Sequence, residues 1–251
     1  MSAIAIGCIA FACMFGGVLL GIFLRAALPE HHLSTDSKDV VKLGMGLLAT
    51  MAALVLSLLI ASAKSSYDTQ SSELTQMAAN VFLLDRFMAH YGPETKEARD
   101  LLRRAVARAL DGMWPKDGSG PAQWDPTAAR GDSLYDKIQA LSPRNEAQRS
   151  LRAEALRIST DLGRTRWLLF GQGGSSIPVP FLVILIFWVA VIFISFGLFT
   201  PPNATVIAIL FVCALSVSGA IFLILELDRP FEGLIQISST HLRNVLAHLG
   251  H

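Results

Sequence analysis

An apolar segment near the N-terminus carries a line of small or weakly polar residues, which we call the small-residue face. Its members are Gly46, Thr50, Ala53 and Ser57. Their spacings of four, three and four residues place them on one side of an α-helix. In a membrane helix such a side either packs closely against another helix or lines a pore in which hydroxyl oxygens replace part of an ion's water shell. Gly17 and Gly21, four residues apart in the first apolar segment, likewise predict close helix packing. The sequence leaves both interpretations open.

A lysine flanks each end of the small-residue face, Lys42 before it and Lys64 after it. If several copies of the chain surround a pore, these lysines form two rings at its mouths and raise the local anion concentration. The opposite side of the same helix carries large apolar residues, which suit lipid or a packed core: Leu47, Met51, Val55, Leu58 and Leu59. The pattern therefore predicts a helix with two chemically distinct sides.

A charged cluster follows the last long apolar segment. Glu226, Asp228 and Arg229 stand within four positions, directly before Pro230, which cannot continue a helix. Charges at a helix end commonly anchor it at the membrane interface, and at a pore they shape the aqueous mouth. The apolar residues that come next are expected either to lie along the membrane surface or to pack on other helices. They are Phe231, Leu234, Ile235 and Ile237.

Residues suited to metal binding or catalysis are sparse. Five of the six histidines form two groups, His31 and His32 in a short connection and His241, His248 and His251 near the C-terminus. The expected topology puts these two groups on opposite membrane sides. The three cysteines lie inside apolar runs, where a thiol is normally a small buried hydrophobe. No phosphate loop, nucleophile elbow or carboxylate pair occurs. We therefore expect no metal, no cofactor and no enzymatic activity.

The composition is too apolar for an ordinary soluble domain. Of the 251 residues 52% are hydrophobic and only 16% are charged, and the net charge of +1 gives no reason to expect a nucleic-acid partner. Four segments are long enough to cross the hydrocarbon core of a bilayer. They are Ile4–Leu24, Leu43–Ala63, Ile177–Phe199 and Ala204–Leu225. The expected fold class is all-α, a polytopic membrane protein with four transmembrane helices and a helical soluble insert.

The predicted organisation is two spans, an insert, two spans and a tail. We expect a first hairpin over residues 1–63, a helical domain over 64–176, a second hairpin over 177–225, and a charged exit with an amphipathic tail over 226–251. With an even number of spans, the insert and both termini share one side of the membrane. The distribution of Lys and Arg favours the cytoplasm for that side, so we expect a multi-pass protein of the inner (plasma) membrane.

The insert has the pattern of a helical bundle. Apolar residues repeat three and four positions apart in a seam from Leu74 to Tyr91 and again from Leu151 to Leu169, with a further helix over Glu94–Asp111. The first seam and the second span are expected to form one rod. The Gly- and Pro-rich residues 112–132, with Trp114 and Trp124, predict a loop. Trp167, close to the third span, is typical of an interfacial anchor.

The stretch LDRPFEG, with Asp228, Pro230, Phe231 and Gly233, resembles the element of Asp or Asn followed by Pro-Phe-Gly that comes after the last membrane helix in bestrophin channels. Together with ASAKSSYDTQSSE after the second span and the two-plus-two arrangement of spans, the chain resembles the bacterial bestrophin-like family of membrane proteins. That resemblance covers most of the chain. The resemblance to bestrophins themselves consists mainly of topology and this short motif.

The resemblance implies a homo-oligomer, pentameric in bestrophins, that passes small inorganic ions. Second helices would surround a central path that continues through a cytoplasmic helical vestibule, and the small-residue face and the seam from Leu74 to Tyr91 would serve it. Bestrophins also carry acidic residues after Pro-Phe-Gly that help form a calcium clasp. Here residues 234–239 read LIQISS, and the aromatic neck of animal bestrophins is missing from Leu43–Ala63. Calcium gating and ion selectivity therefore do not carry over.

Two functions follow from these observations. The first is a passive ion channel with the second span lining its path. The second is a non-conducting membrane scaffold or sensor whose helical domain binds a partner, which explains the helical seams equally well. A membrane enzyme would need polar groups converging within the spans, and Thr50 and Ser57 are too few for that.

Overall fold

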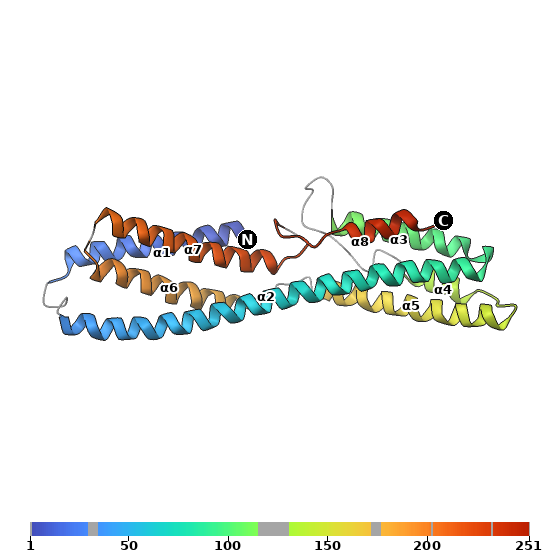
Figure 1. Cartoon of the computed structure of the whole chain (residues 1–251), viewed down its shortest axis with the longest axis horizontal. Helices are drawn as coiled ribbons and strands as arrows, with labels where there is room; N and C mark the ends of the chain where they lie inside the picture. The colour runs from blue at the N-terminus through green and yellow to red at the C-terminus, as the bar shows by residue number, and fades with distance from the viewer. Residues whose placement is uncertain are drawn as a thin grey trace. The chain divides into compact units, whose positions relative to one another are not determined.

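The structure is a computed structural model, and it describes residues 2–29, 35–114, 131–171, 177–201, 203–231 and 233–250. His31, His32, Trp124 and His251, considered above, lie outside these ranges. Every regular element in the described ranges is helical, as expected. The helices are α1 (Ala3–Ala27), α2 (Thr35–Tyr91), the short 3-10 helix η2 (Pro93–Thr95), α3 (Lys96–Met113), α4 (Gly131–Gln139), α5 (Glu146–Gly171), α6 (Val179–Phe199), α7 (Ala204–Leu227) and α8 (Thr240–His248) (Figure 1).

Four of these helices, α1, α2, α6 and α7, are long and apolar enough to cross a membrane. The chain divides into two compact units, which we call the apolar unit (Met1–Ser66 with Ser175–Asp228) and the polar unit (Tyr67–Gly174 with Arg229–His251). Helix α2 is continuous from Thr35 to Tyr91, which confirms the prediction of one rod, and contributes to both units.

Backbone-to-backbone contact holds α1 against α6 in the apolar unit. A Cβ atom added to Gly21 would lie 2.1 Å from the backbone oxygen of Ile194, and one added to Gly197 would lie 2.2 Å from the backbone oxygen of Val18. At Gly17 the added atom would be 3.2 Å from the backbone oxygen of Ala190. Only glycine permits the approach at Gly21 and Gly197, and the contact at Gly17 is tighter than most Cβ contacts, so the prediction of close packing at Gly17 and Gly21 is confirmed.

Helix α2 contributes only a narrow strip of side chains to the core of the apolar unit. Ala52, Leu59 and Ala63, spaced seven and four residues apart, are its buried apolar residues there. A strip of this width leaves the greater part of the helix surface uncovered. The rest of that core comes mainly from α1, α6 and α7.

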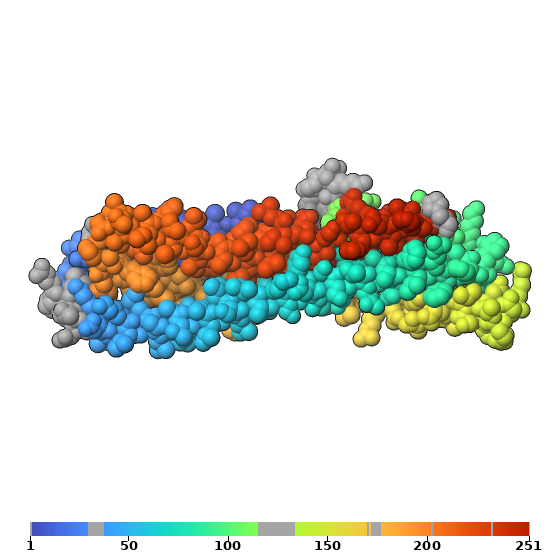
Figure 2. Space-filling model, viewed as in Figure 1, coloured from blue at the N-terminus to red at the C-terminus, as the bar shows by residue number. Residues whose placement is uncertain are grey.

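The seam from Leu74 to Tyr91 forms the core of the polar unit. Its members at three- and four-residue spacings are all buried: Leu74, Met77, Val81, Leu84, Met88 and Tyr91. They belong to one apolar cluster with residues of α3 and α5 and with Ile237 and Leu242 of the C-terminal tail. Figure 2 shows α8, in dark red, on the surface of the polar unit. The seam is thus buried within the chain's own core, as the bundle interpretation predicted.

A buried ion pair joins α2 to α3 across the turn that separates them. The guanidinium of Arg99 donates from Nε to Oδ1 of Asp85 at 2.7 Å and from Nη2 to Oδ2 at 2.9 Å. The Asp85 side chain is only 4% exposed. The hydrogen bonds to this carboxylate raise the pKa of Arg99 above its ordinary value. A two-pronged bond of this kind fixes the angle between the helices as well as their separation.

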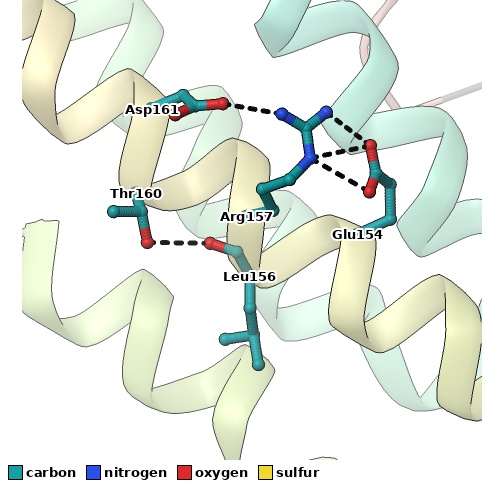
Figure 3. Close-up of polar contacts among 5 residues, drawn as sticks. All are labelled: Glu154, Leu156, Arg157, Thr160 and Asp161. Atoms are coloured by element: carbon teal, nitrogen blue, oxygen red, sulfur yellow. Dashed lines mark hydrogen bonds and ion pairs between the residues drawn. The ribbon is translucent and has the colours of Figure 1, made fainter.

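Helix α5 carries a charged network on its outer side (Figure 3). Arg157 donates to Glu154, three residues earlier, and to Asp161, four residues later. The hydrogen bond from Arg157 lowers the pKa of the Glu154 carboxyl. The spacing is that of neighbours on a helix surface, and the exposure of all three side chains makes the network a weak source of stability.

Candidate functional site

The small-residue face of α2 lies outside the packing of the subunit. Gly46, Thr50, Ala53 and Ser57 are all exposed, and nothing lies within 4 Å of a Cβ atom added to Gly46. Helix geometry turns Thr50 and Ser57 roughly 150° away from the buried Ala52. The close packing that explains the glycines of α1 therefore does not explain these residues within one subunit.

Both hydroxyl groups of this face are bonded to their own helix. Thr50 Oγ1 donates to the backbone oxygen of Gly46 at 2.8 Å, and Ser57 Oγ donates to that of Ala53 at 2.8 Å. Each hydroxyl proton is thereby used internally, and the oxygen lone pairs are what the side chain presents outward. The face offers two oxygen acceptors on an otherwise smooth surface with little side-chain bulk.

The two lysines beside this face have different surroundings. The ammonium group of Lys42 lies 3.3 Å from the carboxylate of Asp39, and the two side chains are 71% and 64% exposed. Asp39 offsets part of the positive charge that the sequence assigned to the Lys42 end of the small-residue face. In the sequence, only the three-residue spacing between Asp39 and Lys42 indicated this pairing. Lys64, at the other end, is exposed on α2.

The charged cluster after α7 is mostly buried. Glu226 and Asp228 are each 6% exposed, whereas Arg229 is exposed. Both residues take part in further polar or electrostatic interactions. The backbone N–H of Asp228 donates to the oxygen of Ile224 at 3.1 Å and closes the last turn of the helix. Arg229 is therefore the exposed member of the cluster.

The family-like motif forms a closed loop over Pro230–Ile237, which we call the Pro-Phe-Gly loop. The backbone N–H of Ile237 donates to the oxygen of Pro230 at 2.8 Å, which ties the ends of the loop together. Gly233 has a φ of +85°, a conformation that glycine adopts without strain. Pro230 is buried and Phe231 is partly buried, so the motif serves to turn the chain and dock it. Glu232 lies outside the described residues.

Trp114, at the end of α3, holds this loop against the polar unit. Its indole Nε1 donates to the backbone oxygen of Ile237 at 3.0 Å, and its ring meets that of Phe231 edge to face with 5.8 Å between centroids. The sequence placed Trp114 in a loop and assigned it no role. The two ends of this hydrogen bond are 123 residues apart, so no local pattern signals it.

A profile of the Bestrophin-like domain matches residues 12–242 of the chain. The chain belongs to the bestrophin-like family. The match includes most of α1 and all of α2, α6, α7 and the Pro-Phe-Gly loop, so it covers both units of the structure. No curated protein and no solved structure matches the chain.

This bestrophin-like protein shows no metal site among the residues that the structure describes, where no three His, Cys, Asp or Glu side chains gather. The segment after the motif, residues 234–239, contains no carboxylate. Ile237 from that segment is buried in the core of the polar unit. In this chain the position after Pro-Phe-Gly therefore serves packing.

Proposed function

We propose that this bestrophin-like protein is an oligomeric ion channel. Several copies, five if the arrangement of bestrophins holds, surround a central axis, and the small-residue face of α2 from each copy lines a passive path for small inorganic ions. The four apolar helices lie in the inner (plasma) membrane, and the polar unit and both termini lie in the cytoplasm. Membership of the bestrophin-like family, whose namesakes are channels, supports this proposal.

One observation carries the proposal: the subunit uses one set of small residues for packing and leaves the other unused. Gly21 and Gly197 are enclosed by backbone atoms of the neighbouring helix. Gly46 has an open surface in front of it, and Ala53 and Ser57 are exposed. Small residues with no packing partner in their own subunit are explained if the surface they form has to leave room for a path.

The other uncovered side of α2 differs in character. Leu47 and Leu58 are 65% and 63% exposed, and bulky apolar side chains of this kind suit lipid or a neighbouring subunit. Ala53 and Leu58 point about 140° apart on the helix. The proposal therefore assigns these two residues of one helix to different environments, which mutagenesis can separate.

Charged residues at the ends of the path shape its mouths. Lys64 and the exposed Arg229 are the candidates on the side of the polar unit, with Glu226 and Asp228 supporting the helix end behind them. Lys42 is the candidate at the opposite mouth, where Asp39 reduces its net charge. Charges of both signs near that mouth leave the sign of the permeant ion unassigned.

The test is ion flux from liposomes that contain only the purified protein. Ala53→Phe is expected to reduce flux strongly, because the added ring enters the path once from every subunit. Leu58→Phe is the matched control, since it places the same ring about 140° away from Ala53 around the helix, and it is expected to leave flux close to that of the unaltered protein.

Equal effects of Ala53→Phe and Leu58→Phe would contradict the assignment of the path to the small-residue face. A monomeric protein without flux would instead support a membrane scaffold or sensor whose polar unit binds a partner. Light scattering of the purified protein in nanodiscs distinguishes a monomer from a ring of subunits.

A further inference from the structure

We propose that the polar unit is anchored directly to the bilayer surface through two apolar contacts, the tip of the Pro-Phe-Gly loop at Leu234 and the end of α5 at Trp167 and Leu168. The partner is the interfacial zone of the lipid headgroups. This inference concerns how the polar unit is held at the membrane, and it does not depend on whether the protein conducts ions.

In the described part of the polar unit, most of the large exposed apolar side chains are close in sequence to a helix that can span the membrane. The large ones are Leu83, Tyr135, Trp167, Leu168 and Leu234. Three of these five stand close to a connection with a helix capable of spanning the bilayer: Trp167 and Leu168 precede α6, and Leu234 follows α7. Single exposed apolar residues are common on soluble domains, but at these positions, next to the spans along the chain, a membrane surface can cover them.

The Pro-Phe-Gly loop has the form of a fixed base with an apolar tip. Trp114 and the hydrogen bond from Ile237 to Pro230 hold the base, while Phe231 and Ile237 pack inward. Leu234 is 79% exposed, the highest value among the large apolar side chains that the structure describes. The sequence allowed all of these apolar residues to lie along the membrane, and the structure separates those that pack from the one that projects.

The outer side of α5 changes character towards its C-terminal end. Arg157, Thr160 and Arg164 are exposed there, and one turn further on Trp167 and Leu168 take their place. Tryptophan is enriched at the membrane–water boundary because its ring is amphipathic. Arg164, one turn before Trp167, is placed to extend its guanidinium towards the headgroups while its apolar stem lies along the helix surface.

Both contacts belong to the same end of the polar unit. Figure 1 shows the C-terminal ends of α3 and α5 and the start of α8 together at that end. Pro230, the base of the loop, is three residues beyond the last residue of α7, which limits its distance from the helix end to about 10 Å. The headgroup layer on each side of a bilayer is about 5–8 Å deep. Chain connectivity alone therefore puts the loop within reach of that layer.

The test is a depth measurement by spin labelling of the full chain in nanodiscs. Cys8, Cys13 and Cys213 are replaced by alanine, and a nitroxide is attached to Leu234→Cys or, as the control, to Ala153→Cys on the exposed side of α5. Collisions with oxygen, which concentrates in lipid, are compared with collisions with a water-soluble nickel chelate. We expect a several-fold higher ratio of oxygen to nickel accessibility at position 234 than at position 153.

Two results would overturn the proposal. High nickel accessibility at position 234 means that the tip lies in water. Low accessibility to both reagents means that protein covers it, which points to a second copy of the chain. Trp167→Cys, labelled in the same way, gives an independent reading from the other contact, and a nickel-accessible label there excludes anchoring by α5.

Discussion

Replacing Gly21 with alanine is expected to push α1 away from α6 and destabilise the apolar unit. The new Cβ atom would stand 2.1 Å from the backbone oxygen of Ile194, 2.9 Å from the backbone nitrogen of Leu198 and 3.0 Å from the Cα atom of Gly197. All three neighbours are backbone atoms, so no side-chain rotation relieves the contact. The helices must separate by about 1 Å, because Cβ atoms essentially never approach a heavy atom within 3.0 Å.

The expected cost of this separation is about 1–3 kcal/mol, the range for inserting atoms into a packed core. A folded chain of this size loses about 2–4 °C of melting temperature per kcal/mol. We therefore expect the melting temperature of the Gly21→Ala variant in detergent to fall by about 2–12 °C, which intrinsic tryptophan fluorescence measures.

Gly16→Ala is the matched control, since Gly16 lies on the same helix with nothing within 4 Å of an added Cβ atom. There alanine is expected to be neutral or to stabilise the helix by up to about 1 kcal/mol through its better helix propensity. Equal falls in melting temperature for Gly16→Ala and Gly21→Ala would refute the reasoning, because they would show that the backbone contact between α1 and α6 carries no special cost.

Two further predictions concern the polar unit. Asp85→Asn leaves the guanidinium of Arg99 without its buried counter-charge and is expected to lower the free energy of unfolding by about 3–5 kcal/mol, which thermal unfolding measures. Glu154→Gln, at an exposed ion pair, is the control. An equal loss of stability in the two variants would contradict a special role for burial. Trp114→Phe removes the hydrogen bond to the backbone oxygen of Ile237 and is expected to lower the free energy of unfolding by about 1–3 kcal/mol. It should also speed amide hydrogen exchange in the C-terminal tail. Unchanged exchange in the tail would contradict the docking role of the indole.

The regular spacing of apolar residues predicted the long helices, because in a long helix the spacing repeats over many turns. The three- and four-residue spacing from Leu74 to Tyr91 predicted both the helix and its buried side, and the structure confirms both. The spacing of Gly17 and Gly21 likewise predicted a close helix contact. In each case the repeat extends over enough turns, or uses a residue type so specific, that few other arrangements satisfy it.

Contacts between distant segments were not predictable in the same way. Asp85 and Arg99 are 14 residues apart on different helices, and many other charge pairs in the polar segment had equal claim to pair. Trp114 finds its partner 123 residues later. The burial of Glu226 likewise depends on tertiary packing around the end of α7 and leaves no trace in local sequence.

Short helices also escaped the sequence analysis. The loop predicted over residues 112–132 was wrong at both bounds, because α3 continues to Met113 and α4 begins at Gly131. Helix α8 has only nine residues. Such helices are marginal alone and form because an apolar side is buried. In α8 that side includes Leu242, which is completely buried in the core of the polar unit. The tail was expected to be amphipathic, and the structure shows what its apolar side packs against.

The most direct test of the proposed channel is passive ion flux through liposomes that contain only this protein, compared between Ser57→Phe and Leu58→Phe. The two positions are adjacent on α2, and both side chains are exposed. We predict measurable flux for the unaltered protein, strong inhibition by Ser57→Phe, and little change with Leu58→Phe. Absence of flux from a correctly folded oligomer, or equal inhibition by the two substitutions, would contradict this prediction.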